Sequence, residues 1–231
     1  MANLLKNLDR REVAGLAPKC EGIIGDSLAK IQFHQQKTQP NNKKMKPIKF
    51  ILAAVVSSLG LAAHADTFKI DPVHSSIVFS IQHLGITDFI GRFNDVSGTV
   101  VFDKADPSKS SVEISIPVES IDTHNEKRDQ HLKSPDFFNA KQFPMIVFKS
   151  KSVEASGDDY KVTGELMLHG VTKPLTLEIK RVAEGQGMEG ETRLGGGTRF
   201  KFKRSDFGMD FMQGPLGDEV TVFVSLEGVK Q

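Results

Sequence analysis

The sequence contains almost no cysteine, which limits the chemistry available to it. The only cysteine, Cys20, lies in an N-terminal stretch that we interpret below as absent from the mature protein. The remaining chain then needs no disulfide in an oxidising compartment, and it excludes thiol chemistry and cysteine-ligated metal sites. No serine lies in a G-x-S-x-G motif and no P-loop occurs, so the sequence shows no recognisable catalytic constellation of these kinds.

A long hydrophobic run is also missing. The apolar stretch at residues 50–61 has about twelve residues, whereas a membrane-spanning helix needs about twenty. It follows the basic segment Met45-Lys46-Pro47-Ile48-Lys49 and precedes Ala63-His64-Ala65, which is the order of a cleavable secretory signal peptide. We therefore predict a signal peptide at residues 45–65, cleavage between Ala65 and Asp66, and no transmembrane anchor.

Residues 1–44 precede this signal, although a signal peptide normally begins at the N-terminus. We interpret them as an extension that is not native, with translation starting at Met45; the alternative is a long, disordered leader. Cleavage after residue 65 leaves residues 66–231, or 166 of the 231 residues, as one domain. This length allows a sizeable core.

Basic residues are scarce in that domain. The first 65 residues hold ten Lys and Arg and four Asp and Glu, which leaves 20 basic and 25 acidic residues and a net charge near −5. No basic run occurs, so we expect no electrostatic site for nucleic acid or for an anionic membrane surface.

The domain does contain hydrophobic alternation with a period of two, which places successive side chains on opposite faces of a sheet. Gly, Asp, Asn and Pro separate the runs, and this predicts an all-β antiparallel sandwich or barrel rather than an α/β fold. A closed sheet of about eight strands can enclose one small or slender ligand. The runs lie at residues 68–70, 77–81, 96–102, 112–118, 146–148, 160–168, 175–179, 200–202 and 220–226.

One segment, at residues 123–138, interrupts the alternation. Thr123-His124-Asn125-Glu126 has the T-x-x-E spacing of a capping box and predicts a short helix that ends near Lys133. Ser134-Pro135-Asp136 resembles a second helix start, with proline at the first helical position. One or two short helices here would place Phe137 and Phe138 either over one end of a barrel or in its core.

Histidines are the starting point for an enzyme, and the domain has five of them. His124 and His131 are seven residues apart on the expected helix and could bind a metal; the alternative is capping and surface hydrogen bonding, and no H-E-x-x-H motif occurs. His83 has the parity of the apolar residues at 77–81. It is therefore expected on the apolar face, either as a satisfied core residue or as a group that meets the polar end of a ligand.

Nine short strings, spread in order over nearly all of residues 67–229, resemble the YceI-like family of polyisoprenoid-binding, lipocalin-like proteins. The strings are Ile70-Asp71-Pro72-Val73-His74-Ser75, Gly91-Arg92-Phe93, Ser120-Ile121-Asp122-Thr123, Arg128-Asp129-Gln130-His131-Leu132, Asp136-Phe137-Phe138, Phe143-Pro144, Gly164-Glu165-Leu166, Leu168-His169-Gly170-Val171-Thr172 and Arg204-Ser205-Asp206-Phe207-Gly208. Any one string is weak, but nine in register are specific.

The resemblance implies an extended, lipocalin-like antiparallel β-barrel in the bacterial periplasm. Its long apolar pocket would bind an isoprenoid lipid, either a polyprenyl phosphate or the tail of a quinone, and no separate cofactor or metal is expected. We predict that the tail contacts apolar residues of shared parity and the adjacent aromatics: Phe79, Ile81, Ile114, Ile116, Phe137, Phe138, Phe148, Leu166 and Leu168.

The polar head group would be selected near the mouth of the pocket. Our candidates are His83, Arg92, Arg128, His131 and Arg204, because a guanidinium can bind phosphate through two parallel hydrogen bonds. The alternative is that these side chains pair with Asp122, Asp129 or Asp206 and hold loops in place.

Two other functions stay open at this stage. One is a hydrolase or metal-dependent enzyme that acts on such lipids, for which His124 and His131 would have to bind metal. The other is a stress-related interaction protein whose pocket is incidental. The sequence leaves the oligomeric state open, with a homodimer as the alternative to a monomer.

Overall fold

The computed structural model describes residues 65–231. The expected N-terminal extension at residues 1–44 and the expected signal peptide at residues 45–65 lie outside the described residues, except for Ala65. The first strand begins at Asp66, directly after the expected cleavage position.

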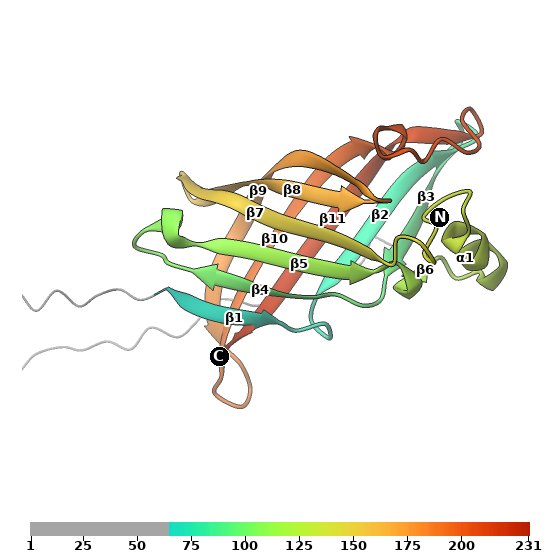
Figure 1. The fold of residues 1–231 in the computed structure, drawn as a ribbon. Helices are drawn as coiled ribbons and strands as arrows, with labels where there is room; N and C mark the ends of the chain where they lie inside the picture. The colour runs from blue at the N-terminus through green and yellow to red at the C-terminus, as the bar shows by residue number, and fades with distance from the viewer. Residues whose placement is uncertain (1–64) are drawn as a thin grey trace, which may run out of the picture. The chain divides into compact units, whose positions relative to one another are not determined.

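The described chain is one closed antiparallel sheet (Figure 1). Its strands run in the order β1-β4-β5-β7-β8-β9-β10-β11-β2-β3-β6, and β1 also pairs with β11, which closes the barrel. The strands are β1 (Asp66–Ile70), β2 (Ser76–His83), β3 (Thr87–Phe93), β4 (Ser97–Phe102), β5 (Ser111–Pro117), β6 (Ile121–Asp122), β7 (Met145–Ser156), β8 (Asp159–Leu168), β9 (Val171–Gln186), β10 (Thr192–Lys203) and β11 (Leu216–Lys230).

Three of the eight barrel positions hold two short strands in succession, namely β1 with β2, β3 with β4, and β5 with β6. Both β1 and β2 pair antiparallel with β11, while β4 pairs with β1 and β3 with β2. Each interruption therefore bends a barrel strand without moving it out of the sheet. Every barrel position then neighbours the next one along the chain, so the fold is an up-and-down barrel and the prediction of about eight antiparallel strands is confirmed.

The two ends of the barrel differ in their connections. We call the mouth end the one that carries residues 84–86, the segment 118–144, the turn 169–170 and the loop 204–215. The closed end carries residues 103–110, the turn 157–158, the turn 187–191 and the start of β1. Figure 1 shows α1 and the β2–β3 hairpin together at the right, on the mouth end.

The helix at the mouth end is shorter than the capping-box pattern predicts. Helix α1 spans Glu126–Lys133, and its N-cap is Asn125, whose side chain accepts a hydrogen bond from the Arg128 amide. His124 adopts a left-handed conformation with φ 58°, which separates Thr123 from the helix. The prediction of Thr123 as the cap is therefore wrong, and its hydroxyl instead bonds the carboxylate of Asp129.

The second helix, expected to begin at Ser134-Pro135-Asp136, is not formed. The backbone from 134 to 138 makes turns, and its amides bond back toward the end of α1: Phe138 N to Leu132 O and Ala140 N to Lys133 O, each at 2.9 Å. These bonds fold the segment over the helix end, so the proline starts a turn rather than a helix. Three short 3-10 helices occur elsewhere in the described part, η1 (Pro107–Lys109), η2 (Val118–Ser120) and η3 (Arg204–Phe207).

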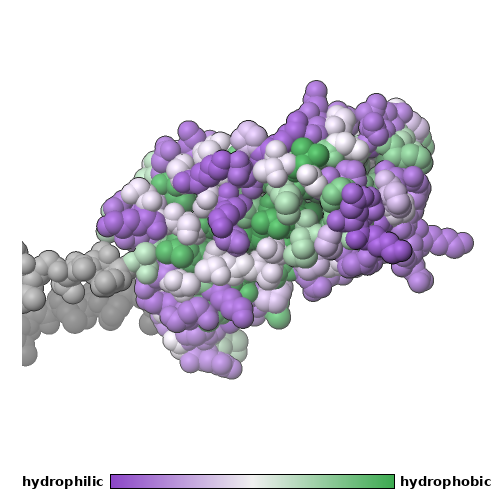
Figure 2. Space-filling view, in the orientation of Figure 1, coloured by the Kyte–Doolittle hydropathy of each residue, from purple (hydrophilic) through white to green (hydrophobic). Residues whose placement is uncertain are grey.

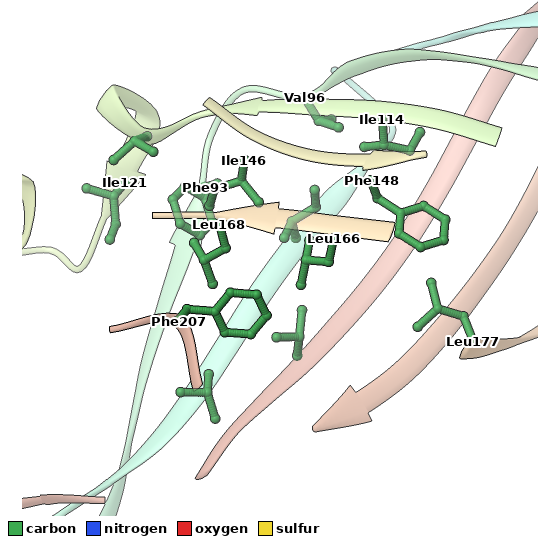
Figure 3. Packing of buried hydrophobic residues seen from close by; sticks show 14 of the residues in the cluster. Phe93, Val96, Ile114, Ile121, Ile146, Phe148, Leu166, Leu168, Leu177 and Phe207 are labelled. Atoms are coloured by element: carbon green, nitrogen blue, oxygen red, sulfur yellow. The ribbon is translucent and has the colours of Figure 1, made fainter. Parts of the chain in front are cut away.

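The alternation predicted from the sequence is realised as an apolar interior. Ile146 and Phe148 on β7 and Leu166 and Leu168 on β8 point inward and are buried (Figure 3). The predicted hairpin between the runs at 160–168 and 175–179 is confirmed, with Leu168 opposite Val171 and a two-residue turn between them. No helix within residues 65–231 is long and apolar enough to cross a membrane.

Candidate functional site: an apolar cavity open at the mouth end

The barrel interior is hollow. A cavity of about 440 Å³ extends from the mouth end into the barrel, and a second of about 100 Å³ lies beyond it toward the closed end. Six residues line both: Val112, Val162, Ile179, Thr198, Val224 and Leu226. The two cavities are therefore adjacent sections of one elongated space, and the combined volume falls in the range of pockets for small organic ligands.

All nine residues predicted to contact a hydrocarbon tail line the larger cavity. They come from β2, β5, β7, β8 and the turn after α1, so their common parity does correspond to the barrel interior. Strands β9, β10 and β11 contribute further lining residues that were not predicted to contact the tail, including Leu177, Phe200, Phe202, Val220 and Val222. Those residues carry the same alternation signal, which shows that side chains share a face but not which face is inside.

The closed end is sealed by a second apolar cluster. Phe68 is fully buried, Phe102 and Leu194 are 9 % and 8 % exposed, and Tyr160 packs edge-on against Phe102 with ring centroids 5.4 Å apart. These side chains form the floor of the smaller cavity. A ligand can therefore enter only from the mouth end or through the wall.

The glycines of β10 leave extra space on the inner side of the barrel wall. The register between β9 and β10 shifts between Gly195 and Gly197, and a Cβ atom at Gly196 would lie 3.2 Å from Ile179 Cγ2 and 3.3 Å from Val182 Cγ2. The missing side chain at Gly196 thus leaves room beside the inward-pointing residues of β9. The hydroxyl of Thr198, two residues away, has no hydrogen-bond partner among the described residues.

Arg128 lies at the mouth and is the predicted head-group residue with the most freedom to bind. Its guanidinium stacks over the ring of Phe89 at 4.3 Å, its Nε donates to Thr123 Oγ1 at 2.9 Å, and its Nη2 donates to the Thr123 carbonyl at 2.6 Å. Within residues 65–231 it forms no ion pair with a carboxylate. The remaining N–H groups of Arg128 are therefore free to meet an anion at the cavity entrance.

His131, on the same helix, also lines the cavity. Its Nε2 lies 2.8 Å from Asp136 Oδ2, and its ring packs edge-on against Phe137 and Phe211 at 5.1 Å and 5.6 Å. The carboxylate fixes the orientation of the imidazole, and the two phenyl rings hold it at the rim. His131 therefore presents a fixed, half-exposed polar group beside Arg128.

His83 lies at the end of β2, where it is exposed and lines the cavity entrance. The interpretation as a satisfied core histidine is wrong, because the strand ends at this residue and its inward parity leads to the mouth rather than to the core. Its role toward a head group stays a prediction.

Arg204 is 4 % exposed, and it serves mainly to hold a loop. Its Nε donates to the carbonyl of Gly217 at 2.9 Å, and Nη1 donates to those of Met209 and Phe211, both at 2.7 Å. Burial lowers the pKa of this guanidinium. With most donors committed to backbone carbonyls, Arg204 positions the loop at 208–217 beside the cavity that it lines.

Arg92 is the one predicted head-group residue that the structure does not bring to the cavity. It is exposed on β3 opposite Asp122, between the inward-facing Gly91 and Phe93. Because alternate residues of a strand face opposite sides, Arg92 points away from the interior. Its selection from a family string was wrong in this respect, and the parity of Phe93 could have shown it.

One group among the described residues has the arrangement of metal ligands, Asp71, His74 and Glu227. Arg193 Nη1, however, lies 2.8 Å from Asp71 Oδ2 and 2.6 Å from Glu227 Oε1, so a guanidinium already occupies the centre of this group. Hydrogen bonds from His74 and then Arg193 lower the pKa of Asp71 to about 2. The cluster joins β1, β10 and β11 and has a structural role; His124 and His131 form no such group in this part of the chain.

The glycines Gly185, Gly187 and Gly190 have the spacing G-x-G-x-x-G, a pattern that also occurs in dinucleotide-binding proteins. Here they end β9 and form the turn to β10, with a strand rather than a helix following. The helix N-terminus that would bind a pyrophosphate is missing from this segment, so these glycines do not form a dinucleotide site.

Comparison with known proteins agrees with this architecture. Residues 68–228 match the family model described as the YceI-like domain. The chain is 41 % identical over 181 residues to "Protein YceI" of Escherichia coli O17:K52:H18, which covers 78 % of this chain and 94 % of that protein. "Protein YceI" of Salmonella arizonae is likewise 41 % identical over 184 residues, covering 79 % and 96 %.

Solved structures show the same fold. BcnA of Burkholderia cenocepacia matches with a TM-score of 0.61 at 24 % identity, over 68 % of this chain and 98 % of that one. A polyisoprenoid binding domain of Saccharophagus degradans, implicated in plant cell wall breakdown, matches with a TM-score of 0.56 at 16 % identity, over 72 % and 99 %. None of these names denotes an enzyme. The hollow eight-position barrel and the match over residues 68–228 agree, and the chain belongs to the YceI-like family.

Proposed function

We propose that this protein binds an isoprenoid lipid, holding the hydrocarbon tail inside the barrel and the polar head group at the mouth. The observation that carries the proposal is the shape and lining of the cavity: a long apolar interior with its charged side chains gathered at one end. An isoprenoid alcohol, phosphate or quinone has the same division into a long tail and one polar end. The polyisoprenoid binding domain among the similar structures supports this ligand class.

Tail burial alone supplies enough free energy for such a complex. Burying a CH₂ group contributes about 0.8 kcal/mol, so about ten buried groups contribute roughly 8 kcal/mol, which corresponds to micromolar affinity before ordering costs. The cavity offers almost no polar surface to compete for this contact. The head group is then needed for orientation and selectivity rather than for affinity.

At the mouth, Arg128 is the residue that we propose to select the head group. Its free N–H groups can form charge-assisted hydrogen bonds to a phosphate, and its position over Phe89 fixes their direction. His131 and His83 would add one polar contact each. This arrangement favours a polyprenyl phosphate over a neutral polyprenol, whereas the tail cavity accepts both.

Mass spectrometry tests the ligand directly. Protein purified from its own host should release a prenyl lipid on organic extraction, and ligand-free protein should take up added polyprenyl phosphate. The variant Leu166→Trp fills the cavity from β8 and should abolish uptake, whereas Met167→Trp places the same side chain on the neighbouring, outward-facing residue and should not. Uptake that is equal in the two variants would refute the interior site.

The head-group assignment has its own test. Arg128→Gln should weaken binding of a polyprenyl phosphate while leaving the affinity for the corresponding polyprenol unchanged. Arg128→Lys keeps the charge but loses the two-pronged geometry, so it should restore only part of the difference. An equal loss for both lipids would show that Arg128 acts on the fold of the mouth instead.

We further propose that the protein acts in the periplasm as a carrier or store rather than as an enzyme. The proposal is supported by the export signal in the sequence and by β1, which begins at Asp66, so that cleavage after Ala65 would leave every described strand intact. Intact-mass measurement of the protein from a periplasmic extract should give a chain that begins at Asp66. A chain confined to the cytoplasm and beginning upstream would overturn this part.

A further inference from the structure

Large apolar side chains are exposed at the mouth end. Within residues 65–231, five of the nine most exposed large hydrophobic residues come from the β2–β3 hairpin and the loop before β11. We define the apolar rim as Leu84, Ile86, Phe211 and Met212, which are 55 %, 81 %, 39 % and 41 % exposed. Figure 2 shows hydrophobic surface at the upper right, where Figure 1 places these two segments.

The two segments of the rim are tied into one platform. The Leu84 amide donates to the Pro215 carbonyl at 2.7 Å, and Leu216 lies opposite His83 at the start of the β11–β2 pairing. Arg204 donates a hydrogen bond to the Phe211 carbonyl. The rim therefore has a fixed shape, and its side chains project outward from supported backbone.

The rim is continuous with the cavity entrance. Met212 lines the cavity, and the Phe211 ring packs edge-on against Phe137, another lining residue, at 5.3 Å. A hydrocarbon that leaves the cavity at this edge would pass over the rim before it met water. The exposed apolar surface thus extends the lining of the cavity to the outside.

The charged residues next to the rim indicate which kind of surface it can contact. Residues 84–91 and 205–216 contain Asp88, Asp206 and Asp210 but no Lys or Arg, and Asp206 is paired with Lys173 at 3.5 Å. The rim therefore offers no basic side chain to an anionic membrane surface, and a zwitterionic surface does not require one. The contact would depend on burial of apolar side chains in the interfacial layer.

The backbone at the rim favours glycine, yet large side chains stand there. Leu84 and Met212 both adopt left-handed conformations, with φ 54° and 56°. Glycine would adopt this region at no steric cost. The side chains of Leu84 and Met212 are nevertheless 55 % and 41 % exposed, which agrees with a contact made to another surface.

We propose that the apolar rim docks on the surface of a zwitterionic lipid bilayer and places the cavity mouth against the acyl chains. A tail then moves between bilayer and barrel without crossing water. This proposal rests on the lipid-binding function above and names the surface from which the ligand is taken or to which it is delivered.

Vesicle flotation tests the docking. The wild type should float with phosphatidylcholine vesicles, equally at low and high salt, and Leu84→Ser/Ile86→Ser should reduce the bound fraction about tenfold. The matched control Val73→Ser/Met188→Ser removes two apolar side chains that are 82 % and 104 % exposed away from the rim, and it should float like the wild type. Wild-type protein that stays unbound, or equal binding by both double variants, would overturn the proposal.

The same variants separate docking from lipid binding. Leu84 and Ile86 do not line the cavity, so their double variant should bind detergent-solubilised polyprenyl phosphate normally but take it up from vesicles about tenfold more slowly. Leu166→Trp should float with vesicles although it takes up no lipid.

If neither the wild type nor any variant takes up an isoprenoid and flotation still depends on the rim, the proposed ligand is wrong and the docking stands. A dimer in sedimentation that dissociates in the rim variant, without vesicle binding, would assign the rim to a second copy of the chain and refute the membrane contact.

Discussion

The closed end and the mouth end of the barrel are formed by the same strands, but the first is sealed and the second is open. At the closed end β9 and β10 pair from Gln186 with Thr192 to Lys180 with Gly197, and Phe68 fills the interior behind them. Beyond Gly197 toward the mouth the two strands diverge, so residues 171–179 and 198–203 have no pairing with each other. The sheet is continuous at the closed end, whereas toward the mouth it has a gap between β9 and β10.

The residues that fill the two ends differ in the same sense. The closed end is finished by apolar side chains with little or no exposure, whereas the mouth is finished by loops that Arg204, Thr123 and Asp129 tie together through polar contacts. Apolar packing therefore seals the closed end. Polar ties at the mouth leave the apolar surface free for a ligand, and the following variants test this division.

The largest effect is expected from Phe68→Ala at the closed end. Phe68 is fully buried, so its truncation leaves a cavity and should lower the free energy of unfolding by about 4 kcal/mol. Phe211→Ala, at the mouth, removes a ring of the same size that is 39 % exposed and should cost about 1 kcal/mol or less. Urea unfolding measures both, and similar losses would remove the distinction between the ends.

Arg204→Met should have the next largest effect. It leaves the carbonyls of Met209, Phe211 and Gly217 without their donor, which should cost about 3 kcal/mol. Hydrogen exchange should speed up in residues 208–217 and stay unchanged in β7 and β8. Uniform acceleration over the whole barrel would show that Arg204 supports the core rather than the loop.

Gly196→Leu tests the length of the cavity. Gly196 lines the smaller cavity, where the new side chain would crowd Ile179 and Val182, so a long prenyl chain should bind about tenfold more weakly while a short one binds as before. Arg199→Leu is the control, because Arg199 is exposed on the same strand and lines neither cavity. Competition between lipids of different chain length gives the ratio, and an equal loss for both lengths would contradict the expected depth of binding.

The smallest effect is a pH dependence from Asp71. Its pKa in the folded protein is about 2, below the ordinary value of 3.8, so it stabilises the fold above about pH 4 and this contribution is lost as the pH falls toward 2. Asp71→Asn should therefore flatten the stability profile between pH 4 and 2, by less than about 1 kcal/mol because the cluster is partly solvated. Urea midpoints across this range measure it, and parallel profiles would show that Asp71 is unimportant.

The sequence predicted the wall of the barrel better than its ends. Alternation is a local property of strands, so Ile114, Ile116, Phe148 and Leu166 were placed on one face, and that face proved to be the cavity lining. The interruptions at residues 71–75 and 94–96 depend on partners far along the chain, such as Glu227 opposite the Ser75 hydroxyl. No local pattern contains that information.

At the mouth, local sequence patterns gave wrong predictions of where helices begin, because the backbone conformation of single residues decides this. A left-handed His124 moved the helix cap from Thr123 to Asn125, and bonds back to α1 turned the expected second helix into turns. Arg128 and Arg204 were chosen for the same chemistry, yet one has free donors and the other is committed to carbonyls. Only the folded loop distinguishes them.

Closure of the barrel joins the two ends of the domain, since Phe68 pairs with Lys230 and the Thr67 carbonyl accepts from the Gln231 amide. The same seam continues in the pairing of β2 with β11, and all other neighbouring barrel positions are consecutive along the chain and can form as hairpins. Because the seam joins the two ends of the domain and has the largest loop-closure entropy, we expect it to form last. Until then the chain has two unpaired strand edges, and removing residues 228–231 would leave β1 without its partner on β11, as a site for aggregation.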